Sequence, residues 1–288
     1  MSATVSLGVL AGHFGRDVAR CVSKVVRILE AARGDGVDLV VFPHATLGGY
    51  LEDLRHPSPD GLPPLVDPDG PEFTRIRDAA RETTVCLGFT EEGNGTRYNT
   101  AVCLTGDGIL GTHRKVHQPV DEGEFYSPGD EFRVIDTPVG RLGMVIDYDK
   151  TFPESTRSLA LDGAVVIAAL SAWPASVTDR ASRLPSDRQS RLFDLYDCAR
   201  AAENQVFVVS SHQTGTMGAH RFLGQAKVVG PGGEILASTR SKGGFATVRV
   251  DVTAEIGRAR RTLSHLTERR PETYSSTPAT TLSIPGRP

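Results

Sequence analysis

The sequence has few lysines, few cysteines and no long apolar run, and each scarcity excludes a class of protein. Lysine supplies only five of the 32 basic side chains, the rest being arginine, so each lysine deserves individual scrutiny. The four cysteines form no CxxC pair, and we expect them to be reduced core residues rather than a disulfide framework. No apolar run approaches the roughly 20 residues that cross a bilayer, and the N-terminus lacks the pattern of a secretory signal. We therefore expect a cytoplasmic protein without membrane contact.

The charge balance excludes another class of partner. A formal net charge of -3 and a pI near 6.2 create no overall basic field for nucleic acid or anionic lipid. The 288 residues are 39% hydrophobic, which is enough to bury a large core. These values favour a globular protein that binds a small-molecule substrate or ligand.

Short β-branched runs alternate with helical stretches along the chain, which predicts an α/β fold. Three later segments are separated by tight turns, which predicts that part of the sheet is antiparallel. The predicted strands are Val5–Leu10, Val37–Phe42, Val85–Phe89, Ala101–Leu104, Leu142–Ile146, Val165–Ala169, Val206–Ser210, Phe222–Val229, Ile235–Ser238 and Phe245–Val250. The predicted helices are Arg16–Arg33, Glu72–Glu82, Glu154–Asp162 and Asp187–Glu203.

No linker divides the chain, so residues 1–270 are expected to form a single domain. Residues 271–288 contain little that could form a core, and we expect an extended or disordered tail. The stretches Arg55–Gly70 and Trp173–Ser186 are rich in turn-forming and polar residues. They are expected to be long loops that border a site.

Polar residues follow two of the predicted strands. The segment VDLVVFPH ends at His44, and RLGMVIDYD places Asp147 and Asp149 after its apolar run. The segment GTHRKVHQP, which carries Lys115, lies between these two in the sequence. Ligands of open α/β sheets bind beyond the carboxyl ends of strands. The side chains of His44, Lys115 and Asp147 are therefore candidates for one site.

The same segments carry a resemblance to a known family. VDLVVFPHATLGGY, RYNTAVCLTGDGILGTHRKVH, EFYSPGD, DTPVGRLGMVIDYDKTFPE, ARAAENQVFVVSS and FLGQAKVVGPGGEILA resemble, in order and spacing, the nitrilase superfamily of carbon-nitrogen hydrolases. The resemblance implies a four-layer α-β-β-α sandwich with mixed sheets, a homodimer or higher homo-oligomer, and a Glu-Lys-Cys catalytic triad.

Two positions depart from the family pattern. His44 stands where the resemblance places the glutamate base, and Asp147 stands where it places the cysteine nucleophile, whereas Lys115 is retained. The acidic loop that follows offers either Glu122 or Glu124 as the family's accessory glutamate. Tyr50 and Tyr148 belong to the surrounding pattern, and the resemblance makes both of them, together with Glu124, candidate substrate contacts.

The missing thiol changes the chemistry that the site can perform. A carboxylate that attacks an amide would expel a poor leaving group and form a high-energy anhydride. We therefore do not expect Asp147 to replace the thiol as the nucleophile in ordinary amide hydrolysis. A His–Asp pair can instead abstract a proton or activate water, while an ammonium stabilises an oxyanion. The leading hypothesis is acid–base chemistry by His44, Lys115, Asp147 and Glu122 on a small polar, nitrogen-containing substrate, as hydrolysis, elimination, condensation or cyclisation.

The alternative hypothesis is a catalytically inactive relative that binds a ligand or acts as a scaffold subunit. In that case the Lys115–Asp147 pair would be a buried ion pair that replaces a lost site.

A metal site is disfavoured because Lys115 would oppose the ion, and no HExxH spacing is present. We expect no cofactor. Trp173, the single tryptophan, follows a predicted strand and is expected to line the pocket.

Overall fold

The strands of the protein form one large sheet of mixed direction, seen in a computed structural model that describes residues 4–239 and 243–275. The sheet contains β1 (Val5–Gly12), β2 (Leu39–Val41), β3 (Thr84–Gly93), β4 (Thr96–Thr105), β5 (Gly108–Arg114), β6 (Val134–Thr137), β7 (Gly140–Ile146), β8 (Val166–Ser171), β9 (Phe207–Gln213), β12 (Lys227–Val229), β13 (Ile235–Ser238) and β14 (Gly244–Val250). A separate hairpin pairs β10 (Thr216–Met217) with β11 (His220–Arg221). The α-helices are α1 (Val18–Gly34), α2 (Pro71–Ala80), α3 (Pro153–Leu161), α4 (Arg188–Asn204) and α5 (Val252–Ala259).

The sheet consists of two halves. The first half contains β5, β4, β3, β2 and β1, the other contains β9, β8, β7 and β6, and they meet where β1 pairs with β9. The strand order is β5-β4-β3-β2-β1-β9-β8-β7-β6, and β1 pairs with β9 only near their carboxyl ends, at Ala11 and Gly12. The central pairs β1–β2, β2–β3, β7–β8 and β8–β9 are parallel. The outer strands β4, β5, β6, β12, β13 and β14 pair in antiparallel fashion. The prediction of a mixed sheet is confirmed.

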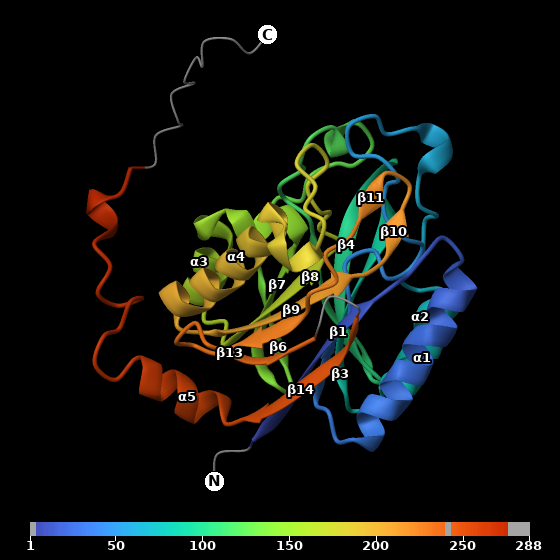
Figure 1. The fold of residues 1–288 in the computed structure, drawn as a ribbon. Coiled ribbons are helices and arrows are strands. Elements are labelled where there is room, and N and C mark those ends of the chain that lie inside the picture. Colours follow the sequence, from blue (N-terminus) through green and yellow to red (C-terminus); the bar gives the residue numbers. More distant parts are fainter. Residues whose placement is uncertain (1–3, 240–242, 276–288) are drawn as a thin grey trace, which may run out of the picture.

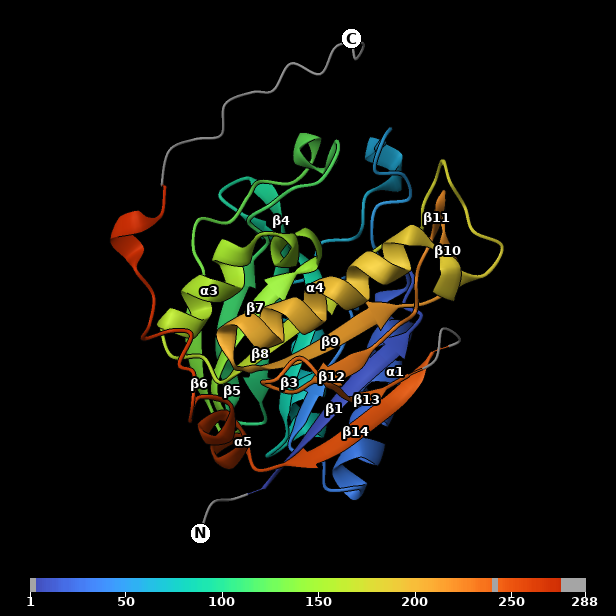
Figure 2. The same ribbon diagram turned by 60° about the vertical axis from the view of Figure 1, so that its left-hand side comes forward.

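Three apolar clusters hold the layers together. One contains side chains from both halves of the sheet, such as Leu39 and Met144. A second joins α1 and α2 to the first half, and a third joins α3 and α4 to the other half. Helices therefore cover both outer faces, as Figures 1 and 2 show, which agrees with the predicted four-layer α-β-β-α sandwich. Burying this much apolar surface is the main favourable term in folding.

The long helices begin where their sequences provide caps. The side chain of Asp17 accepts a hydrogen bond from the backbone of Arg20 at the start of α1. Asp187 caps α4 through the backbone of Gln189 in the same way. A capping carboxylate satisfies backbone N–H groups that have no partner within the helix. Each helix therefore starts within two residues of its predicted position.

The structure corrects one predicted strand and adds elements that were not predicted. The predicted strand Phe222–Val229 is wrong, because only Lys227–Val229 is extended in the sheet. Gly224 interrupts it with a φ of +69°, a left-handed conformation that glycine adopts readily. Strands β5 and β6 and helix α5 were not predicted.

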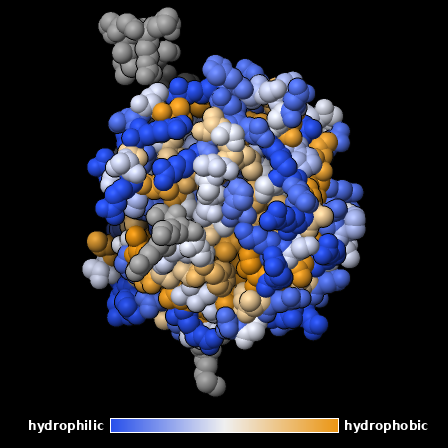
Figure 3. Space-filling view, turned by 45° about the vertical axis from the view of Figure 1, so that its right-hand side comes forward, coloured by the Kyte–Doolittle hydropathy of each residue, from blue (hydrophilic) through white to orange (hydrophobic). Residues whose placement is uncertain are grey.

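The two predicted loops contain only short 3-10 turns, η1 (Pro59–Gly61) and η4 (Leu184–Ser186). The expected tail is described only to residue 275, where it holds the turn η5 (Pro271–Thr273), and positions 276–288 lie outside the described residues. Between residues 4 and 275, apart from 240–242, no helix is long and apolar enough to span a membrane. On the face in Figure 3, hydrophilic residues surround smaller hydrophobic groups.

Candidate active site

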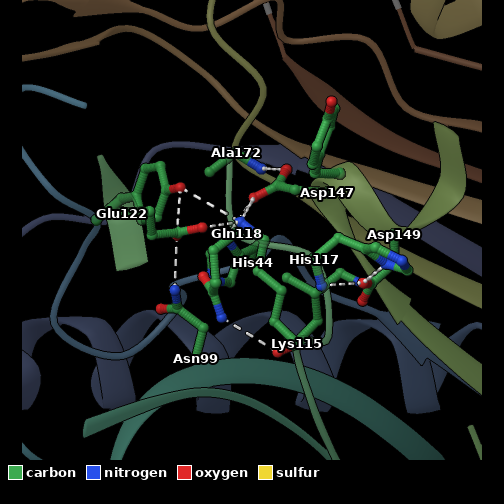
Figure 4. Close-up of polar contacts among 12 residues, drawn as sticks. His44, Asn99, Lys115, His117, Gln118, Glu122, Asp147, Asp149 and Ala172 are labelled. Carbon is green, nitrogen blue, oxygen red and sulfur yellow. Dashed lines mark hydrogen bonds and ion pairs between the residues drawn. The ribbon is translucent and has the colours of Figure 1, made fainter. Parts of the chain in front are cut away.

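Both halves of the sheet contribute strand ends to one polar cluster (Figure 4). His44 lies three residues beyond β2, and Lys115 directly follows β5. Asp147 directly follows β7 in the opposite half and opens the 3-10 turn η3 (Asp147–Thr151). The two residues that the sequence placed at strand ends, His44 and Asp147, are therefore brought together with Lys115.

His44 and Asp147 form a direct pair. His44 Nδ1 lies 2.6 Å from Asp147 Oδ2, and both side chains are buried. The other carboxylate oxygen, Oδ1, accepts a 2.6 Å hydrogen bond from the backbone N–H of Ala172, at the end of β8. Asp147 has a φ of +44°, an uncommon conformation for a residue with a side chain. The surrounding contacts thus hold this carboxylate in a fixed and unusual position.

The pair has a defined protonation pattern. Burial alone would raise the pKa of the Asp147 carboxyl, but His44, Lys115 and the N–H of Ala172 outweigh it and hold that pKa below its usual value. Because Asp147 is then ionised at neutral pH, the close contact requires the proton to sit on His44 Nδ1. The second ring nitrogen, Nε2, is buried and has no partner within the described residues.

Lys115 pairs most closely with a different carboxylate from the one expected. Its Nζ lies 2.6 Å from Glu122 Oε2 but 4.0 Å from Asp147 Oδ2. Glu122 also accepts hydrogen bonds from the Tyr50 hydroxyl at 2.5 Å and from Asn99 Nδ2 at 2.7 Å. Burial, followed by the charge of Glu122, raises the pKa of the Tyr50 hydroxyl well above its usual value. Tyr50 is therefore a neutral donor.

The structure also separates the two glutamates between which the sequence left a choice. Glu122 is fully buried against Lys115, whereas Glu124 is exposed and contacts neither Lys115 nor the cavity. Both belong to the short turn η2 (Glu122–Glu124). The structure therefore puts Glu122, and not Glu124, within the polar cluster.

Asp149 holds the segment that carries Lys115 in place through hydrogen bonds. Its carboxylate accepts hydrogen bonds from the backbone N–H groups of Val116, His117 and Ile146. It also contacts the rings of His113 and His117 at 3.0 and 2.9 Å. Although burial opposes it, these partners hold the pKa of Asp149 well below its usual value. These contacts connect the end of β5 to the end of β7.

A second buried charge network was not predicted. Asp197 bridges Lys150 and Lys227 at 2.7 and 2.8 Å, and both ammonium groups lie over the ring of Phe193. Burial is the main cause that lowers the pKa of Lys150 to about 8. Three of the five lysines, Lys115, Lys150 and Lys227, are therefore buried in ion pairs. The scarcity of lysine in the sequence made each lysine informative but did not show where its partners lie.

A cavity of about 410 Å³ lies over this cluster. Of the eight site residues predicted from the sequence, the four that line it are Tyr50, Asp147, Tyr148 and Trp173. His44, Lys115 and Glu122 lie behind the wall with no exposed surface, and Glu124 lies elsewhere. Asp147 is therefore the charged member of the cluster that a ligand would meet first.

No thiol borders this cavity. Cys21, Cys86 and Cys103 are buried and Cys198 is partly buried, and none of the four belongs to the lining residues. Within residues 4–239 and 243–275, no three His, Cys, Asp or Glu side chains are grouped so that they could hold a metal ion. The groups at hand are carboxylates, imidazoles and an ammonium, which suit proton transfer and charge stabilisation.

Two residues of the site escaped the sequence analysis. Asn99, on β4, donates to Glu122, and His220, on β11, lines the cavity. Asn99 belongs to the quoted segment RYNTAVCLT, so the resemblance covered it without indicating a role. His220 lies in a two-residue strand that has neither periodicity nor a motif.

Comparison with known proteins places the chain among enzymes that act on carbon–nitrogen bonds. A family model described as carbon-nitrogen hydrolase matches residues 10–261. The chain is 32% identical over 218 residues to a nitrilase of Pyrococcus abyssi, which covers 75% of this chain and 77% of that protein.

Solved structures share the fold. A carbon-nitrogen hydrolase of Helicobacter pylori G27 aligns with a TM-score of 0.83 at 24% identity, over 95% of this chain and 97% of that one. A variant of an amidase from Nesterenkonia sp. AN1, with an acetamide moiety covalently added at its active site cysteine, aligns with a TM-score of 0.73 at 21% identity. That alignment covers 93% of this chain and 94% of the amidase.

Proposed function

This chain belongs to the carbon-nitrogen hydrolase family, and we propose from that premise that it is an enzyme that acts on a small polar, nitrogen-containing substrate by acid–base chemistry without a thiol. The observation that carries the proposal is the 2.6 Å contact between His44 Nδ1 and Asp147 Oδ2 at the floor of the cavity. A histidine oriented by a carboxylate is the arrangement that general-base catalysis commonly uses.

The absence of a cysteine from the cavity lining supports the claim that no thiol takes part. The Nesterenkonia amidase has an active site cysteine. Here the sequence resemblance places Asp147 where the family has its cysteine, and His44 where it has its glutamate. On these assignments a charged group replaces the nucleophile, and another species must attack the substrate.

Water is the nucleophile in the hydrolytic form of the proposal. His44 Nε2, which carries a lone pair when Nδ1 holds the proton, removes a proton from water as the water oxygen bonds to the carbon of the C–N group. The imidazolium that forms is stabilised by Asp147, and it returns the proton to the leaving nitrogen as the C–N bond breaks. Elimination, condensation or cyclisation would use the same proton transfers without the attack of water.

The burial of His44 sets a condition on this mechanism. His44 contacts two cavity-lining residues, since its ring lies 4.9 Å from that of Tyr50 and its Nδ1 contacts Asp147. Its Nε2 is shielded from the cavity, so substrate binding must shift a side chain in the floor. Catalytic contacts often tighten only when substrate is bound.

Substitution of the pair tests the proposal. His44→Ala and Asp147→Asn should each reduce turnover by roughly 10²- to 10⁴-fold, the usual contribution of a general base. Asp60→Asn is the matched control, because Asp60 is an exposed carboxylate that does not line the cavity. Product formation is measured by mass spectrometry, and folding is checked by circular dichroism. Full activity in both His44→Ala and Asp147→Asn would refute the mechanism.

A specific observation supports a second candidate, a ligand-binding or scaffold subunit without catalysis. Both oxygens of Asp147 already accept hydrogen bonds, and His44 and Lys115 have no exposed surface. This candidate expects ligands to bind with no turnover of any amide or nitrile, and a partner enzyme to be recovered by pull-down. Turnover that disappears in Asp147→Asn would exclude it.

The proposal includes a cytoplasmic setting and a homodimer or higher homo-oligomer. The family resemblance supports the assembly, and Leu161 on α3 and Leu195 on α4 are exposed on the outer helical layer. Apolar side chains on a helical face are suited to subunit contacts. Sedimentation equilibrium would test the assembly, and a monomer at micromolar concentration would contradict it.

A further inference from the structure

The cavity wall contains a buried histidine that the proposed chemistry does not use. His220 is 5% exposed, lies on β11 and lines the same cavity as Asp147. Its ring is 6.5 Å from that of Tyr50 and 6.3 Å from that of Phe222. Aromatic rings thus flank an imidazole on the wall of the cavity.

Neither ring nitrogen of His220 has a hydrogen-bond partner within the described part of the chain. Most buried polar side-chain atoms in folded proteins are hydrogen-bonded, and an exception requires an explanation. A histidine with a purely structural role would be expected to donate or accept at one nitrogen at least. Because this ring belongs to the wall of a cavity, a bound ligand can provide a partner for one of the nitrogens once a neighbouring side chain shifts, since both atoms are now shielded.

The charge state of His220 narrows the chemistry of that ligand. Burial lowers the pKa of His220, and Asp53 opposes the shift only in part, so the ring is neutral at pH 7. A neutral imidazole has one N–H donor and one acceptor nitrogen. One ligand group can bond only one of these nitrogens, because the two point in different directions. A hydroxyl or primary amide, which both donates and accepts, can pair with whichever nitrogen faces it, whereas a carboxylate could pair only with the N–H and an ammonium only with the bare nitrogen.

The place of His220 indicates which part of the ligand it meets. The ring of Tyr50 is near both histidines, 4.9 Å from His44 and 6.5 Å from His220. His44 contacts Asp147 directly, whereas His220 borders the same cavity from β11 and has no hydrogen-bond partner in the described part of the chain. A ligand that spans the cavity with its nitrogen group at Asp147 can therefore present its other end to His220.

We infer that His220 is a specificity-determining residue that hydrogen-bonds an uncharged hydroxyl or primary amide at the end of the ligand remote from Asp147. The inference rests on the proposed function in one respect, that the cavity binds a small polar nitrogen compound. It does not require turnover.

The test compares ligands that differ only at the remote end. Dissociation constants of 4-hydroxybutyramide and pentanamide, which are of similar length but end in hydroxyl and methyl, are measured by calorimetry. The wild-type protein should bind the hydroxyl compound about 3- to 10-fold more tightly, as expected for one hydrogen bond to a buried group. His220→Phe should abolish this preference, and His220→Gln, which keeps a donor and an acceptor, should retain part of it. His56→Phe, on an exposed residue outside the cavity, should behave as wild type.

The outcomes separate this inference from the proposed catalysis. Equal affinity of the wild type for the two compounds, no binding of either, or an unchanged preference in His220→Phe would overturn the inference. A preference that is lost in His220→Phe supports it even if neither compound is hydrolysed, a result that would count against catalysis alone. If His220→Phe fails to fold, the wild-type preference and the partial preference of His220→Gln decide the question.

Discussion

Replacing Lys115 with methionine should destabilise the protein strongly, because it removes one partner of a buried ion pair. Lys115 and Glu122 are both fully buried and lie 2.6 Å apart. Breaking such a pair from one side costs about 3–5 kcal/mol, since the remaining charge keeps its desolvation penalty. Tyr50 and Asn99 still donate to Glu122, so we expect the lower end of that range, about 3 kcal/mol.

The free energy of unfolding is measured by urea denaturation at pH 7, and a double variant reveals the cause of the loss. Lys115→Met with Glu122→Gln removes the stranded Glu122 charge, and Asp147 keeps its contacts with His44 and the Ala172 N–H, so the double variant should recover most of the stability lost in Lys115→Met. Lys24→Met is the matched control, because Lys24 is half-buried and forms no ion pair with any described residue; its Nζ donates to the backbone of His13 and lies 4.5 Å from the centre of the Phe14 ring. It should cost about 1 kcal/mol or less.

Two results would refute this reasoning. One is a loss below about 1 kcal/mol in Lys115→Met, which would show that the pair is dispensable for stability. The other is a double variant as unstable as Lys115→Met alone, which would show that packing of the lysine chain, rather than the stranded charge, accounts for the loss.

Two further substitutions test the residues that position the site, Asp149 and Gly88. Asp149 has a pKa below its unfolded value near 4, so it stabilises the fold above that pH and loses this effect as the pH falls. Asp149→Asn should therefore lower the free energy of unfolding by on the order of 2–3 kcal/mol at pH 7. In urea denaturation, the difference in stability between this variant and the wild type should narrow below about pH 4, and a difference independent of pH would contradict the assignment. Gly88→Ala should lower stability by about 1–3 kcal/mol and displace His44, because its new Cβ would meet the backbone of Ala45 and His44 at 2.8 and 3.0 Å. Gly61→Ala, where nothing lies within 4 Å, is the control, and equal melting temperatures for the two variants would contradict the packing argument.

The strand ends of the site were predictable from sequence because apolar runs end abruptly there. His44 and Asp147 each follow a buried parallel strand, and the carboxyl ends of parallel strands meet at one edge. Four of the five α-helices, α1 to α4, were also predicted from the sequence, whereas α5 was not. Family resemblance added the layered architecture, which periodicity alone does not specify.

The rest depended on contacts between distant segments. The choice between Glu122 and Glu124 was open because a turn has no periodicity, and burial against Lys115 became visible only in the fold. The relative closeness of the two carboxylates to Lys115, Glu122 at 2.6 Å and Asp147 at 4.0 Å, was hidden for the same reason. His220 and the pair Lys150–Asp197 are isolated polar residues in the sequence, and only packing shows that one lines the cavity and the others neutralise each other.

The central claim is that the chain catalyses a thiol-independent reaction at Asp147. The most direct measurement is mass spectrometry of a panel of small amides and nitriles incubated with the wild-type protein and, separately, with Asp147→Asn. The account predicts a product that forms with the wild type, also after treatment with a thiol-alkylating reagent, and does not form with Asp147→Asn. A product that persists in Asp147→Asn, or that disappears after alkylation, would contradict the claim, and no product from any compound would favour the ligand-binding role.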